Sequence, residues 1–162
     1  MTASFGPAVT RRLIIQGAGA LALIGLGQST LGAWPALAAN DKYPDDAFKQ
    51  KNAAEAIKAL YGKDHEPSDK IKLDAPEIAE NGGVVPISVT TTLPDVSSIS
   101  FVVSENPFAL AASYKFPEGT VPAVANRLKM AKTSNVIALV EAGGKLYSAT
   151  KEVKVTVGGC GG

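Results

Sequence analysis

Residues 84–103 read VVPISVTTTLPDVSSISFVV, and this stretch decides the fold class. Its large apolar side chains recur at every second position on either side of a break, at Val85, Ile87, Val89, Ile99, Phe101 and Val103. Alternation with a period of two and an enrichment in β-branched residues predict strands with one buried face. The break, Leu93-Pro94-Asp95, predicts a turn. The stretch therefore predicts a protein built mainly of β-strands.

The same alternation extends outward from this stretch in both directions. Further strands are predicted near 70–74, 109–116, 121–130, 136–140 and 147–157. Between the last two, Glu141-Ala142-Gly143-Gly144-Lys145 has the composition of a hairpin turn. About seven short strands at regular spacing predict an immunoglobulin-like antiparallel β-sandwich. Pro86 and Pro122 lie within strand patterns and predict sheet edges or bulges.

A helix is predicted before the sandwich, from Asn40 to about Gly62. Asp45 or Asp46 could cap its start, and Gly62 is placed to end it. Its apolar face is formed at the spacing i, i+3, i+4 and i+7 by Ala53, Ala56, Ile57 and Leu60.

Residues 63–70 are predicted to form a polar loop. His65 lies there between Asp64 and Glu66, a composition that could suggest a metal site. The chain has no second histidine, and neighbouring side chains in an extended loop point in different directions. We therefore predict a solvated loop and no metal ligands.

The N-terminal segment has the pattern of an export signal. Arg11 and Arg12 precede an uncharged, glycine-interrupted stretch, and Ala36 and Ala38 are small residues two apart, as at a cleavage site. The paired arginines resemble a twin-arginine signal, the class that exports folded proteins. Five glycines within residues 17–32 disfavour the alternative of a spanning helix. The prediction is export to the periplasm.

The charge of the processed chain limits the choice of partner. Cleavage after Ala38 removes Arg11 and Arg12 from the sixteen basic side chains, which leaves 14 against 15 acidic ones. A net charge near −1 disfavours nucleic acid or an anionic membrane as the partner.

The C-terminal residues Gly158-Gly159-Cys160-Gly161-Gly162, called the tail below, contain the only cysteine of the chain. An unpaired cysteine in an exported protein is either intermolecular or chemically active. The four glycines predict a flexible arm, on which the Cys160 Cα could reach ~10 Å past the last strand. Cys160 is therefore the predicted site of covalent attachment. The sequence thus predicts four segments: a signal peptide (1–38), a helical segment (39–69), a β-sandwich (70–157) and the arm (158–162).

The tail, the paired arginines and the β-rich body together resemble the SoxY family, the sulfur carriers of the bacterial thiosulfate-oxidising Sox system. The resemblance implies a carrier subunit that is not an enzyme and needs no cofactor of its own. It implies a heterodimer with SoxZ, and thiosulfate-derived cargo on Cys160. The transient partners that it implies are the cytochrome SoxAX, which joins thiosulfate to the cysteine, the hydrolase SoxB, which releases sulfate, and in some organisms SoxCD.

Two other functions are compatible with the residues. Gly161-Gly162 fits a ubiquitin-like carrier that bears sulfur as a C-terminal thiocarboxylate, although that chemistry needs activation in the cytoplasm. Alternatively, Cys160 could link two copies of an exported binding module through a disulfide. The atom to which sulfur attaches, on Cys160 or on the Gly162 carboxyl group, separates the two kinds of carrier, and the formation of a sulfur adduct separates a carrier from the disulfide-linked module.

Overall fold

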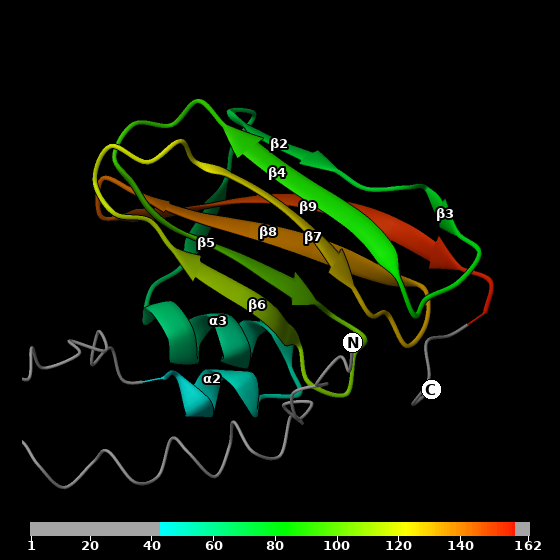
Figure 1. Cartoon of the computed structure of the whole chain (residues 1–162). Helices are drawn as coiled ribbons and strands as arrows, with labels where there is room; N and C mark the ends of the chain where they lie inside the picture. The colour runs from blue at the N-terminus through cyan, green and yellow to red at the C-terminus, as the bar shows by residue number, and fades with distance from the viewer. Residues whose placement is uncertain (1–42, 158–162) are drawn as a thin grey trace, which may run out of the picture. The chain divides into compact units, whose positions relative to one another are not determined.

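The computed structural model describes residues 43–157 (Figure 1). The predicted signal residues Arg11, Arg12, Ala36 and Ala38 lie outside this range, so their assignment stays a prediction. The described helices and strands are α2 (Asp45–Phe48), α3 (Ala53–Tyr61), β1 (His65–Pro67), β2 (Ile71–Asp74), β3 (Ile78–Ala79), β4 (Val85–Thr91), β5 (Val96–Val103), β6 (Leu110–Lys115), β7 (Ala123–Leu128), β8 (Ser134–Ala142) and β9 (Lys145–Val155).

The described strands form two sheets that pack face to face (Figure 1). The larger sheet has the order β1-β9-β8-β5-β6, with β3 pairing to β9 as well, and the smaller has the order β2-β4-β7. All pairs are antiparallel except β1–β9 and β3–β9, which are parallel. This arrangement confirms the predicted immunoglobulin-like β-sandwich.

The inner faces of the two sheets enclose the main core. The alternating side chains that predicted the strands all lie in it: Val85, Ile87, Val89, Ile99, Phe101 and Val103. Tyr114 of β6 packs edge-to-face on Phe101, with ring centroids 6.4 Å apart. Burial of apolar area on this scale is the dominant favourable contribution to folding.

The predicted hairpin at 141–145 is confirmed. Ala142 pairs with Lys145, so Gly143 and Gly144 alone form the turn between β8 and β9. Their φ angles are +55° and +77°. Two-residue turns of type I′ need positive φ at both positions, which glycine adopts without a steric penalty.

The single helix predicted from Asn40 to Gly62 is wrong within the described residues, because the chain forms two helices separated by 49–52. Asn52 has an extended backbone, and its Oδ1 accepts a hydrogen bond from Ala54 N at 2.8 Å, which starts α3. This local side-chain cap competes with a continuous helix. Neither Asp45 nor Asp46 caps α2, whereas Gly62 ends α3 in the left-handed conformation, as predicted.

The two helices cover the face of the larger sheet that points away from the smaller one (Figure 1). A second apolar cluster forms there, in which Ala56 and Ile57 of α3 meet Val102, Leu139 and Leu146 of the sheet. β5 is consequently buried on both faces along most of its length.

Two short strands were not predicted. Residues 65–67 were expected in a polar loop but form β1, and residues 78–79 form β3; both pair in parallel with β9. Their backbone bonds to β9 define them, and no local alternation of side chains does. Pro86 lies opposite Arg127 of β7 but beyond Ser88, the last β4 residue paired to β2, so it occupies a local sheet edge. Pro122 directly precedes β7.

Candidate functional site

The site residues predicted from the sequence, Cys160 with Gly158, Gly159, Gly161 and Gly162, lie outside the described residues. The described residue next to the tail is Val157, two residues beyond the end of β9. What the structure defines is therefore the base from which the chain continues to Cys160.

Backbone hydrogen bonds hold the chain in place as far as Val157. Thr156 N donates to Ala79 O at 3.1 Å, and Gly82 N donates to Val157 O at 2.8 Å. The Thr156 hydroxyl also donates to Glu80 O at 3.0 Å. These bonds extend the β3–β9 pairing beyond the strand end, so Val157 has a defined position on the sandwich.

A second loop supports this base from the other side. Met130 N donates to Gly82 O at 2.7 Å, and Val155 N donates to Thr133 Oγ1 at 3.0 Å. Met130 is fully buried in the main core. The base is thus tied to the interior of the sandwich as well as to its neighbouring strand.

Charged side chains of both signs surround the base. The exposed ones nearby are Glu77, Glu80, Lys129, Lys132 and Lys154, and Lys132 pairs with Glu105 at 2.8 Å. This mixture creates no strong field of one sign.

A polar cluster lies at the other end of the larger sheet, beneath the last turn of α3. The Tyr61 hydroxyl lies 2.7 Å from Ser100 Oγ and 3.1 Å from Ser98 Oγ. Lys63 Nζ donates to Glu141 Oε1 at 2.7 Å and to Gly144 O at 3.0 Å. Burial raises the pKa of Tyr61, and the hydrogen bond from Lys63 lowers the pKa of Glu141. Ser98 and Ser100 alternate on β5 with core residues. This alternation is the sequence pattern from which the polar cluster could have been predicted, but the cluster was not predicted.

This cluster borders a cavity of about 390 Å³. Among the described residues, no buried side-chain nitrogen or oxygen lacks a hydrogen-bond partner. Its polar groups are thus used within the fold, which indicates a structural role. A larger hollow of about 620 Å³ over β2, β4 and β7 has Asp74 as the only acid among its described lining residues, and its other polar lining residues are Ser88, Asn126 and Arg127.

The described residues contain no group of three His, Cys, Asp or Glu placed to hold a metal ion. His65 lies on β1, where its Nδ1 is 2.9 Å from Ser148 Oγ. This histidine is used in the pairing of β1 with β9.

Fold and sequence together define a class of protein: a β-sandwich whose last strand is followed, five residues after its end, by the single cysteine of the chain. A family model described as "Sulfur oxidation protein SoxY" matches residues 57–160, more than half of the chain and a range that includes Cys160. The chain belongs to the SoxY family of sulfur carriers.

One solved structure agrees with this membership. The sulfur carrier protein SoxY from Chlorobium limicola f thiosulfatophilum is 43% identical, with a TM-score of 0.59, over 64% of this chain and 96% of that one. A superoxide reductase (neelaredoxin) from Ignicoccus hospitalis is 24% identical, with a TM-score of 0.47, over 53% of this chain and 80% of that one. A search of curated proteins found no match. Within residues 43–157, no helix is long and apolar enough to cross a membrane.

Proposed function

We propose that this chain is a periplasmic carrier that holds thiosulfate-derived intermediates on the sulfur of Cys160 and presents them to separate enzymes. One observation carries the proposal: the only cysteine of a SoxY-family chain lies three residues beyond the hydrogen-bonded Val157. A fixed base and a thiol beyond it suit a carrier.

The first step joins thiosulfate to the cysteine. The Cys160 thiol loses its proton, and its sulfur forms a bond with the terminal sulfur of thiosulfate. The product is a cysteine S-thiosulfonate, and two electrons leave with the bond formation. An oxidant must accept them, and the c-type cytochrome SoxAX, implied by the family, is the proposed acceptor.

The second step removes the sulfonate group. Water attacks the outer sulfur of the adduct, the sulfur–sulfur bond to the sulfonate breaks, and sulfate and two protons leave. Cys160 then bears one extra sulfur atom as a persulfide, and no electrons are transferred. SoxB is the proposed hydrolase, and SoxCD, where present, is the proposed oxidase of the remaining sulfur.

The proposal treats the chain as a carrier and not as an enzyme. Only the thiolate reacts well, and an unperturbed cysteine is mostly protonated at neutral pH. The tail contains no basic side chain to lower the pKa of the thiol. Activation would therefore come from each enzyme that receives Cys160, and the proposed permanent companion is SoxZ.

Export is part of the proposal. Replacing Arg11 and Arg12 by lysines should leave the precursor in the cytoplasm, because the twin-arginine route reads that pair. Fractionation and immunoblotting measure this result. Normal export of the double variant would refute the twin-arginine route.

The Cys160→Ser variant tests the carrier role. Thiosulfate-dependent turnover by the reconstituted system should fall to background, while the thermal unfolding midpoint stays unchanged because position 160 lies beyond β9. Turnover in the serine variant would refute the proposal and favour a thiocarboxylate on Gly162. Full turnover by a disulfide-linked dimer that cannot expose the thiol would also refute it.

A further inference from the structure

The short distance between Val157 and Cys160 constrains every enzyme that acts on the cargo. This inference rests on the proposed function. Three residues of chain span at most ~10 Å. An enzyme whose reacting atoms lie in a recessed site must therefore bring its surface to the base of the tail. The side chains around Val157 are consequently within contact range of any such enzyme.

Three large apolar side chains are exposed around this base. Ile78 is 60% exposed, Val84 is 57% exposed and Val157 is 64% exposed. We name these three residues the collar. Ile78 pairs with Lys154 of β9, and Val84 follows two residues after Gly82, which is hydrogen-bonded to Val157. The collar thus combines β3, the loop before β4 and the end of β9.

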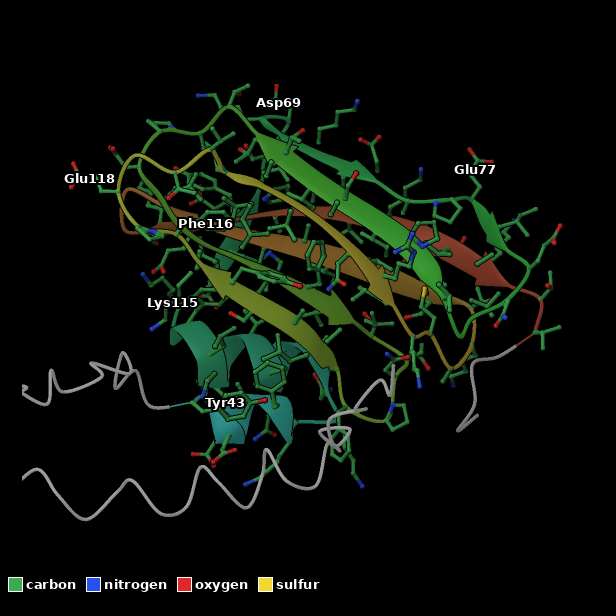
Figure 2. All side chains as sticks on the ribbon, in the orientation of Figure 1. Tyr43, Asp69, Glu77, Lys115, Phe116 and Glu118 are labelled. Carbon is green, nitrogen blue, oxygen red and sulfur yellow. The ribbon has the colours of Figure 1, made fainter. Side chains whose placement is uncertain are left out.

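The collar differs from the other exposed apolar side chains in the described range. Tyr43 stacks on Phe48 beside α2, and Phe108 lies next to Ala109, which bonds to Gln50 on the helical side. Val121 lies in the same loop as Glu118, and Figure 2 shows Glu118 and Glu77 at opposite ends of the sandwich. Isolated exposed apolar residues are ordinary, but a group at one functional point indicates an interaction surface.

We propose that the collar is a docking surface shared by the enzymes that process the cargo, and that it contacts an apolar rim around their active-site entrances. The charges beside the collar are of both signs, so electrostatic attraction of one sign cannot supply the contact. Burial of apolar area can, and it suits several successive partners because it does not depend on one directional bond.

The test uses the processed carrier with its companion subunit, thiosulfate and the cognate SoxAX cytochrome. The variants are Val84→Lys and Ile78→Lys, with Val121→Lys as the matched control of equal chemistry at the opposite end. The initial rate of adduct formation is measured against carrier concentration. The rate of Cys160 alkylation by iodoacetamide is measured in parallel, and size-exclusion chromatography reports on assembly.

Each collar variant should raise the half-saturating carrier concentration by about tenfold, the effect of losing one buried apolar contact and desolvating a charge. The maximal rate and the alkylation rate should stay unchanged, and Val121→Lys should behave like the wild type. Unchanged half-saturation in both collar variants, or an equal shift in Val121→Lys, would overturn the proposal.

Two further outcomes would overturn it as well. Loss of the companion subunit from the collar variants would show that this subunit covers the collar. Loss of a wild-type self-association would show that a second copy covers it. Failure of the collar is distinguishable from failure of the carrier role, because Cys160→Ser would still be inert if only the collar proposal is wrong.

Discussion

The two ends of β9 are held in different ways. At its start, side chains secure the β8–β9 turn: Lys63 bonds to both Glu141 and Gly144 O, and Ser97 Oγ donates to Glu141 at 3.1 Å. At its end, backbone bonds predominate: of the five bonds described above for the base, three join backbone to backbone, and the hydroxyls of Thr133 and Thr156 supply the other two.

This difference suggests separate roles for the two ends, with the turn end contributing to stability and the tail end to the proposed contact with partners. Side-chain bonds at the turn commit particular residues to the fold. The bonds at the tail end do not use the side chains of Ile78, Val84 and Val157, so these three can face solvent without loss of the anchor. The molecule thus fixes the position of the tail base and keeps its surface available for partners.

A pair of glycine variants gives the largest expected contrast. Gly144 has φ +77°, and no other atom lies near the position that a Cβ would take. Gly144→Val should therefore lower the free energy of unfolding by about 2 kcal/mol through backbone strain alone. Denaturant titration measures this loss, and turnover per folded carrier should stay at the wild-type level.

Gly159→Val is the matched substitution at the other end. It should leave the free energy of unfolding unchanged, because position 159 lies beyond β9. If the tail must enter narrow sites, turnover should fall sharply although Cys160 still reacts normally with small alkylating reagents. Two results would contradict this account of the two ends of β9. One is a lower free energy of unfolding in Gly159→Val, and the other is a lower turnover in Gly144→Val without a lower free energy of unfolding.

The Tyr61→Phe variant tests the side-chain network with an intermediate effect. Removal of the hydroxyl that bonds to Ser98 and Ser100 should cost about 1–2 kcal/mol of unfolding free energy. Burial raises the pKa of Tyr61 above its usual 10.0. The wild type should thus hold its full stability below pH 10.0 and lose part of it as pH rises through the higher folded-state pKa.

Urea titrations of both proteins at pH 8 and above pH 10 measure this difference. The difference in unfolding free energy between wild type and Tyr61→Phe should become smaller above pH 10. A difference in unfolding free energy that is the same at both pH values would show that ionisation of the Tyr61 hydroxyl does not affect stability.

The Glu141→Gln variant should have the smallest effect. The ion pair with Lys63 is partly exposed, with side chains 25% and 38% accessible, so its loss should cost at most about 1 kcal/mol. The lowered pKa of Glu141 gives stability that is present above the unfolded value near 4.5 and lost as pH falls through the folded value. The unfolding free energies of the variant and the wild type should therefore become equal near pH 3. A difference between them that grows as pH falls would show that this ion pair does not cause the stability difference.

The sequence predicted those parts of the fold that depend on local pattern. Val85, Ile87 and Val89 alternate because one face of β4 is buried, and Gly143-Gly144 matches the needs of a two-residue turn. β1 and β3 have no such pattern, since their bonds to β9 come from residues more than 70 positions away. The helix break at Asn52 was missed because the apolar spacing that predicted the helix begins at Ala53. This spacing contains no information about whether the helix extends to the residues before it.

For the candidate site, the sequence gives a prediction of the chemistry, which stays a prediction, but no indication of the surroundings. One cysteine among four glycines indicated Cys160 directly. Ile78 lies outside every strand predicted from the sequence and Val84 directly before one, and only the tertiary structure shows that both are exposed beside the end of β9. Exposure of an apolar residue in a strand-rich stretch depends on which strands neighbour it, and local sequence does not encode this.

Intact-mass spectrometry of the processed protein, isolated from cells during growth on thiosulfate, tests the central claim most directly. Wild type should show added masses of sulfur and of a thiosulfate-derived group, all removed by reductant and located by fragmentation on Cys160. The Cys160→Ser protein, isolated in parallel, should show none of them. Adducts that persist in the serine protein, or that locate to the Gly162 carboxyl group, would contradict the account.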